Sequence, residues 1–434
     1  MRTQLKTVSG ACTTVVLGLV LAIAPAYGAE DKATVRITLD EAIKMALKYN
    51  EALNALRTTI EQNQHQETTA NLRPNPGLSA SWSPLPLFHP DEGFKNYFKD
   101  SSGLDIGLSY TIERGGKRGE RLHAAKDVTS VTRSQVSDNE RTLVFQVSSG
   151  FINVQLAEST LDLARENLKS FQNAVDIGES KFKSGGLSEN DYLKIKLQLL
   201  QFQTDFEQAQ LDRAQGLSDL RQLLGYEPVP PDYDVAGAFD YLPIAATFDG
   251  LLTVAEQNRP DLQAAVKSVI AAKSQLSLAQ SNGVQDLTVS ADYVRSPLGG
   301  DKTANTAAIG ISIPLAVFNR NQGEIARTRV AVTQAEFQEA EVHSQVKTDV
   351  RDAYEGLKRN DRIAQYYRSG YLDVSKKSRD ISEYAYKRGA SSLFDFLDAE
   401  RSYRATEIGY RQALAAYLLA VEQVRQAVGT RSLP

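Results

Sequence analysis

Two stretches of the chain without proline carry the helical hydrophobic pattern. No proline occurs between positions 90 and 228 or between positions 314 and 434, and both stretches are rich in residues that favour helix. Apolar residues recur in them every three or four positions, which is the spacing of one helix face. The pattern predicts long helices over about 117–183 and 188–224, and over about 321–387 and 392–428. At 1.5 Å per residue, the first would be roughly 100 Å long, which excludes a compact globule.

Four shorter segments alternate strictly between apolar and small polar residues. Segments of about nine to eleven residues with one apolar and one polar face are what a tilted strand of an outer-membrane barrel requires. A soluble antiparallel sheet packed on helices is the alternative. The expected strands span about 77–86, 103–113, 286–296 and 305–315. In the barrel interpretation, the residues facing lipid include Leu104, Ile106, Leu108, Tyr110, Ile309 and Ile311.

Four strands cannot close a barrel by themselves. Open edges facing lipid would leave unpaired amides, at a cost of several kcal/mol each. Several copies must therefore share their strands. Three copies would give twelve strands around a water-filled lumen, although closure alone also allows two or four copies.

The second half of the chain repeats the pattern of the first. Gly185 corresponds to Gly389, and Gly225 to Gly429, at an offset of 204 residues. We therefore expect an internal duplication. The expected fold class is mainly α with a small β-barrel part: duplicated long helical hairpins plus four transmembrane strands per chain. That the hairpins form a periplasmic α-barrel is what the family resemblance given below implies. The expected divisions are a first repeat over 38–225, a linker or equatorial segment over 226–246 and a second repeat over 247–429.

The first residues predict export from the cytoplasm. Arg2 and Lys6 precede an apolar run and a few small residues, which is typical of a signal peptide, here over 1–28. A membrane anchor is the weaker interpretation, because the run is shorter than the roughly 20 residues that a spanning helix needs. The only cysteine, Cys12, would leave with this peptide. The mature chain would then have neither disulfides nor thiolate metal sites.

The remaining composition argues against several classes of function. The net charge is −4, or −6 without Arg2 and Lys6, so nothing favours a nucleic-acid partner. The glycine-rich run over 114–119 lacks the spacing of a phosphate-binding loop. The four histidines are isolated, and no catalytic constellation can be supported from spacing. We therefore expect no enzyme activity, no cofactor and no resident metal.

Several features together resemble the TolC-like outer-membrane efflux factors over nearly the whole mature chain. They are the duplication, the order of helices and strands, and the turn Tyr386-Lys387-Arg388-Gly389 followed by Asp395-Phe396-Leu397-Asp398. The strand-to-helix junction over 111–118 is similar to the heavy-metal branch, the CzcC-type factors. The resemblance implies a homotrimer whose barrel crosses the outer membrane lipid and whose helices form a periplasmic tunnel. Such a duct would receive substrate, heavy-metal cations among the candidates, through a periplasmic adaptor from an inner-membrane pump of the RND type.

The resemblance also implies where the tunnel closes. Family members close an aperture with acidic residues just after the hairpin turn; Asp395 and Asp398 match those positions, and Asp191 is the equivalent in the first half. Helix capping competes as the role of Asp191 and Asp395, because each follows a serine N-cap by three residues. Ser391 replaces the family's basic partner, so a salt-bridge latch would need Lys387 or Arg388, or be absent. The expected aperture set is Asp191, Asp395, Asp398, Tyr386, Lys387 and Arg388; the expected adaptor contacts are Gly185, Gly186, Leu187, Gly389 and Ala390.

Two alternatives remain open at this stage. A drug, solvent or protein exporter would have the same architecture with another cargo. A periplasmic structural or adaptor protein with a coiled coil and a soluble sheet belongs to a different class.

Overall fold

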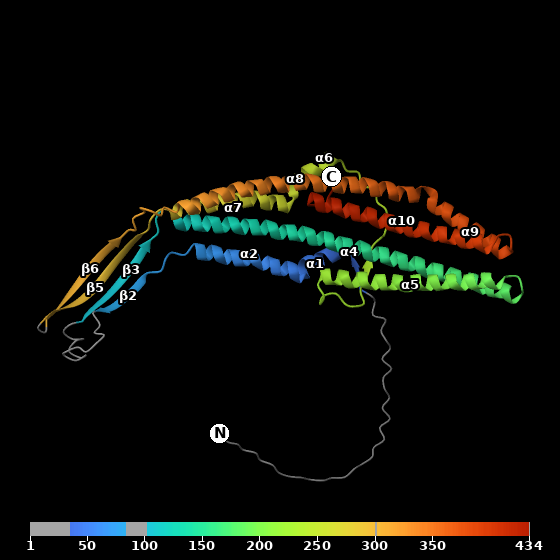
Figure 1. Ribbon diagram of the computed structural model, residues 1–434, viewed down its shortest axis with the longest axis horizontal. Helices are drawn as coiled ribbons and strands as arrows, with labels where there is room; N and C mark the ends of the chain where they lie inside the picture. The colour runs from blue at the N-terminus through green and yellow to red at the C-terminus, as the bar shows by residue number, and fades with distance from the viewer. Residues whose placement is uncertain (1–34, 84–101, 300–301, 434) are drawn as a thin grey trace, which may run out of the picture.

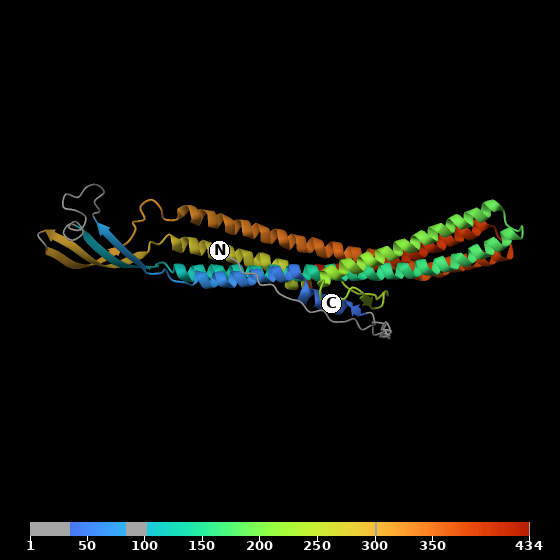
Figure 2. The same cartoon turned by 90° about the horizontal axis from the view of Figure 1, so that it is seen from below.

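The computed structural model describes residues 35–83, 102–299 and 302–433, and these form a long helical rod with a small sheet at one end (Figure 1 and Figure 2). The expected signal peptide and the end of the first expected strand, 84–86, lie outside the described residues. Among the helices that are described, none is long and apolar enough to cross a membrane.

Each half of the chain contributes two helices, a strand pair and a long helical hairpin. The first half contains α1 (Leu39–Tyr49), α2 (Glu51–Ala70), β2 (Gly77–Ser83), β3 (Gly103–Ile112), α4 (Lys117–Lys183) and α5 (Glu189–Leu224). The second half contains α6 (Phe248–Asn258), α7 (Pro260–Asn282), β5 (Leu287–Gly299), β6 (Lys302–Ser312), α8 (Gln322–Tyr366), the π-helical turn η1 (Tyr367–Tyr371), α9 (Leu372–Arg388) and α10 (Leu393–Val428). β1 (Arg36–Thr38), which precedes the first half, pairs in parallel with β4 (Asp234–Ala236), which lies between the halves.

The prediction of one uninterrupted helix over 321–387 is wrong. The backbone leaves the helical region at Ser369 and Gly370, where Gly370 has φ 116°, and α9 continues in a new direction. Glycine reaches this positive φ without the steric cost that a side chain would add. A glycine alone does not predict such a break, because Gly150 and Gly178 lie inside α4 without interrupting it.

The last expected strand also ends earlier than its pattern suggests. β6 stops at Ser312, although the alternation continues to residue 315. The end of β3 pairs with β5 as far as Ile112, whereas β6 is an edge strand with no second neighbour in the described sheet. Alternation thus indicates which face of the sheet each side chain lies on, but a strand continues only where its backbone N–H and C=O groups are hydrogen-bonded to a neighbouring strand.

The four strands form one antiparallel sheet in the order β2-β3-β5-β6, so the β3–β5 pair joins the two halves. Its register places apolar residues opposite apolar ones: Ile106 lies between Ala80 and Tyr293, and Ala291 lies opposite Ile309. Side chains alternate between the two faces of a strand, so this register gathers the apolar residues of all four strands on one face. Ser, Thr, Gly and Asp dominate the other face.

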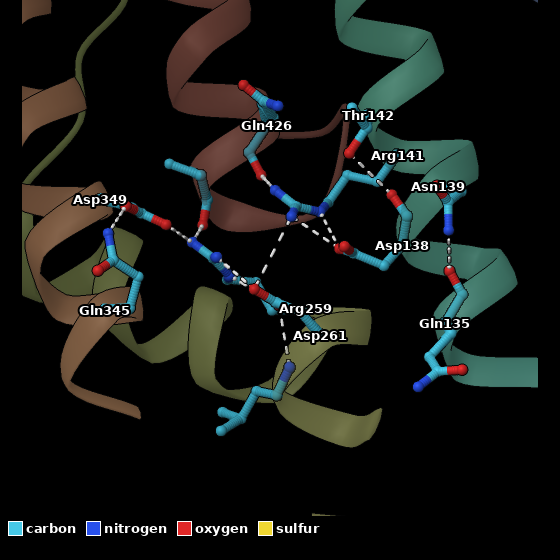
Figure 3. A network of polar contacts seen from close by, with 12 residues as sticks. Gln135, Asp138, Asn139, Arg141, Thr142, Arg259, Asp261, Gln345, Asp349 and Gln426 are labelled. Carbon is cyan, nitrogen blue, oxygen red and sulfur yellow. Dashed lines mark hydrogen bonds and ion pairs between the residues drawn. The ribbon is translucent and has the colours of Figure 1, made fainter. Parts of the chain in front are cut away.

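Midway along the rod, a buried polar network ties four helices together (Figure 3). Arg259, at the start of α7, is 3% exposed, and its guanidinium contacts Asp261 at 3.0 Å and Asp349 of α8 at 2.8 Å. Arg141 of α4 donates to the carbonyl of Gln426 on α10 at 2.6 Å and lies 3.8 Å from Asp261. Burial alone would raise the pKa of Asp261, but the hydrogen bond and charge of Arg259 outweigh it and lower that pKa. The network therefore fixes α7, α8 and α10 against the long helix of the first half.

Candidate functional site at the hairpin tips

The two hairpin turns at the far end of the rod have nearly the same backbone geometry. Gly185 and Gly389 both adopt φ 76°, the left-handed conformation that ends a helix and favours glycine. The next residue then bonds back to the helix: the amide of Gly186 reaches the carbonyl of Lys181 at 2.8 Å, and that of Ala390 reaches Ala385 at 2.9 Å.

Of the expected adaptor contacts, four are exposed at the turns and one is not. Gly185, Gly186, Gly389 and Ala390 are exposed, whereas Leu187 is half-buried and packs beneath them. The exposed positions are thus available to a partner, and their contact with an adaptor stays a prediction.

A serine caps each return helix, the carboxylate of each aspartate accepts from that serine's hydroxyl, and Asp395 also completes a capping box. Ser392 accepts a hydrogen bond from the amide of Asp395 at 3.1 Å, and the carboxylate of Asp395 accepts bonds from Ser392 and Ser391, which lowers its pKa. In the first hairpin, Ser188 accepts from the amide of Asp191 at 3.1 Å. These contacts occupy carboxylate oxygens, but both side chains remain partly or fully exposed.

Asp398 differs from them, because it is exposed and makes no hydrogen bond or ion pair within the described part of the chain. The basic residues before the turn do not reach the aspartates either. Lys387 pairs with Glu383 at 2.7 Å, one turn back on α9, and the guanidinium of Arg388 lies 5.5 Å from the ring of Tyr384. The structure therefore contains no latch between these residues and Asp395 within one copy.

Tyr386 lies inside the chain, in a cluster that joins the two hairpins. It is 5% exposed, stacks on Phe396 with ring centroids 5.3 Å apart, and has a pKa raised mainly by burial. Phe171 of α4 and Phe202 of α5 extend the same stack at 4.6 Å. We call this group the tip cluster; its buried members are Phe171, Ala174, Val175, Ile195, Phe202, Tyr386, Leu393 and Phe396.

Lys181 is the contact between the hairpins that sequence reasoning missed. From α4, its ammonium group donates to the backbone carbonyl of Tyr386 at 2.8 Å and lies 4.5 Å from the centre of that ring. A second bridge follows lower down, where Arg404 of α10 pairs with Asp205 of α5 at 2.6 Å. No spacing rule identifies Lys181, because its partner is 205 residues away and is a backbone atom.

At the other end of the rod, the apolar face of the sheet is open. Ile309 is 89% exposed and Ile311 71%, and Ile106 and Leu108 are exposed as well. Leu104 and Tyr110 share this face and are half-buried. A large unpartnered apolar face of this kind marks an interaction surface.

A long paired-hairpin rod that carries a strand sheet with one apolar face defines a class of cell-envelope channel proteins. The sequence model of the family "Outer membrane efflux protein" matches residues 42–226 and 251–430, and the chain belongs to that family. The expected TolC-like resemblance is therefore confirmed, as is a mainly helical fold with a small sheet. The chain is an outer-membrane protein with a periplasmic extension, and its family supports the role of an efflux exit duct.

Individual relatives agree with this assignment over most of their length. The chain is 21% identical to the cobalt-zinc-cadmium resistance protein CzcC of Cupriavidus metallidurans, covering 91% of this chain and 90% of the relative. It is 23% identical to the outer membrane protein TolC of Vibrio cholerae, covering 77% and 78%. The solved CmeC outer membrane channel of Campylobacter jejuni superposes with a TM-score of 0.75 at 16% identity, covering 91% and 86%. These relatives are efflux or resistance proteins and channels, not enzymes.

Proposed function

We propose that three copies of the chain form one duct through which a tripartite pump exports substrate from the periplasm to the exterior. In this proposal an inner-membrane pump of the RND type supplies the energy, a periplasmic adaptor contacts the hairpin turns, and the duct itself is passive. Each repeat, 38–225 and 247–429, supplies two strands and one helical hairpin to the duct. The linker 226–246 joins the two repeats.

The sheet carries this proposal. Its order leaves β2 and β6 as edges within the described chain, and its apolar face suits lipid while its polar face suits water. An open edge in lipid leaves backbone groups without partners, so copies must join β6 to β2 in a closed ring. Three copies give twelve strands with the polar face inside.

The helical rod supports the same assembly. Leu193, Leu197 and Leu200 form an exposed stripe on α5, with exposed fractions of 51%, 69% and 59%. On the second hairpin, Val374 and Ile381 of α9 are exposed at 64% and 69%. Both stripes begin close to the turns and continue along the helix. Different patches that meet around a ring are what a cyclic, head-to-tail oligomer requires.

For the cargo, we propose heavy-metal cations. CzcC is a cobalt-zinc-cadmium resistance protein and CusC of Escherichia coli a cation efflux system protein, and Asp398 would add a ring of free carboxylates that attracts cations. Drug or solvent export is the second candidate, since TtgF of Pseudomonas putida is a toluene efflux pump protein. Deleting the gene and measuring growth in cobalt, zinc or cadmium against growth in toluene separates the two.

Conductance in a planar bilayer tests the duct directly. The wild-type protein should give defined channels, and changing Asp395 and Asp398 together to Ala should weaken their preference for cations. A protein that never conducts, is extracted without detergent and shows no heat-modifiable oligomer would instead be a periplasmic structural or adaptor protein. Unchanged cation preference in the variant would remove only the aperture assignment.

A further inference from the structure

The segment that follows β6 is an apolar loop that the described part of the chain leaves exposed. Leu315 is 85% exposed, Val317 61% and Phe318 90%. In the other repeat, Ile112 matches Leu315 at the offset of 203 residues that aligns Ile106 with Ile309, and it pairs with Leu287 on β5. The chain at this place in the repeat therefore pairs with a strand in one half and not in the other, and the side chain is 42% exposed at Ile112 against 85% at Leu315.

The loop is held in a defined shape by its own polar groups. The amide of Val317 donates to the carbonyl of Leu315 at 2.8 Å, and the side chain of Arg320 donates to the carbonyl of Ala316 at 3.1 Å. The amide group of Gln322 donates to the carbonyl of Phe318 at 3.0 Å. These bonds engage three carbonyls of the loop while its apolar side chains stay exposed, and the connection from β6 to α8 bows away from the neighbouring helices (Figure 2). The loop is thus preorganised for a partner.

A complementary surface lies at the opposite edge of the same sheet. The connection from α2 to β2 contains Leu72, which is 61% exposed, and Pro74, and both line a cavity of about 550 Å³. Arg121 fixes this connection by donating to the carbonyls of Ala70 and Leu72, each at 3.1 Å. Like the loop, this connection is held by hydrogen bonds from its own chain.

Sheet register places both surfaces at the same end of the sheet. Gly77, the first residue of β2, lies in one cross-strand row with Ser109 of β3, Ser290 of β5 and Gly310 of β6. The residues before β2 and the residues after β6 therefore leave the sheet at its helical end. When β6 of one copy joins the antiparallel edge strand β2 of the next, the loop and the neighbour's α2–β2 connection both leave the shared ladder at its helical end.

We propose that Leu315, Val317 and Phe318 of each copy pack onto the Leu72–Pro74 connection of the next copy and so lock the junction between barrel and rod. The occupant of this surface is a second copy of the chain, and the contact repeats around the ring. This inference rests on the proposed oligomer and adds the particular contact that closes it below the membrane.

Cysteine cross-linking tests the contact, because replacing Cys12 by serine removes the only native cysteine. In that background, Leu72→Cys combined with Phe318→Cys is treated with a short bismaleimide in outer-membrane vesicles. Covalent dimers and trimers are expected on a denaturing gel. Each single variant should give no trimer, since a ring needs both members of the pair in every copy.

A second pair separates failure of the contact from failure of the oligomer. Leu78→Cys with Ile311→Cys reports the β2 and β6 edges alone, and Tyr226→Cys with Phe318→Cys is a negative control far along the rod. If the edge pair gives trimers and the loop pair does not, the loop faces lipid or solvent and the inference is overturned. If neither pair reacts and the detergent-solubilised protein has the mass of one chain, the oligomer itself is refuted, and the inference with it.

Discussion

Replacing Lys181 by methionine should loosen the contact between the two hairpin tips. Methionine keeps most of the apolar stem but removes the charged hydrogen bond to the Tyr386 carbonyl at 2.8 Å and the ammonium above the Tyr386 ring at 4.5 Å. A hydrogen bond to a charged group contributes about 1.5–3 kcal/mol and an exposed cation–π contact about 0.5–1 kcal/mol. Because Lys181 is only half-buried, we take the low end of this range, about 2 kcal/mol per copy.

That loss corresponds to a shift of roughly 30-fold towards separated hairpins in each copy, at 1.4 kcal/mol per tenfold. In a planar bilayer, the open fraction of single channels should rise. Hydrogen exchange should show weaker protection of the amides over 393–398. The two readouts are independent, because exchange reports the tip even if the channel assignment fails.

Two variants serve as controls for this prediction. Lys183→Met removes a lysine of the same helix that pairs only with Glu179 of α4, at 2.8 Å, so neither readout should change. Tyr386→Phe should also have little effect, because the buried hydroxyl of Tyr386 has no hydrogen-bond partner within the described part of the chain. If Lys181→Met behaves like Lys183→Met, the contact between the hairpins does not hold the tip together.

Three further variants test other parts of the structure. Asp395→Ala should destabilise the start of α10 by about 0.5–1 kcal/mol, because it removes the carboxylate that accepts from the Ser392 amide and its charge in the first turn. Asp398→Ala should have no such effect in hydrogen exchange, and equal effects would contradict the separate roles. Arg259→Ala should cost about 2–3 kcal/mol, because it removes a buried guanidinium that bonds to the half-buried carboxylates of Asp261 and Asp349. Arg327→Ala breaks an exposed pair and should cost under about 1 kcal/mol; thermal unfolding followed by circular dichroism compares the two. Burial raises the pKa of Glu400, so the folded state binds its proton more tightly, and the stability from that proton is lost as pH rises through the raised pKa. Glu400→Gln should therefore raise the unfolding temperature at pH 7 and change it little at about pH 4; the opposite order would show that the ionised carboxylate is stabilising.

The sequence by itself determined the elements and their order. Long stretches without proline and with a helical apolar period could only be long helices, and strict alternation over short segments could only place one apolar and one polar face on a strand. The contact between Ser392, the N-cap of α10, and Asp395 could also be predicted from the sequence, because the two residues are only three positions apart. Local geometry depends on nearby residues, so local spacing is enough to predict it.

Tertiary structure alone decided which elements meet. The β3–β5 register, the burial of Tyr386 and the bond from Lys181 to a carbonyl 205 residues away all join segments that no periodic pattern relates. The break at Gly370 is of the same kind, because glycines inside α4 remain helical where packing holds them. Contacts between distant segments depend on how whole helices and sheets pack, and the free energy of that packing is shared over many side chains rather than written in any short stretch of sequence.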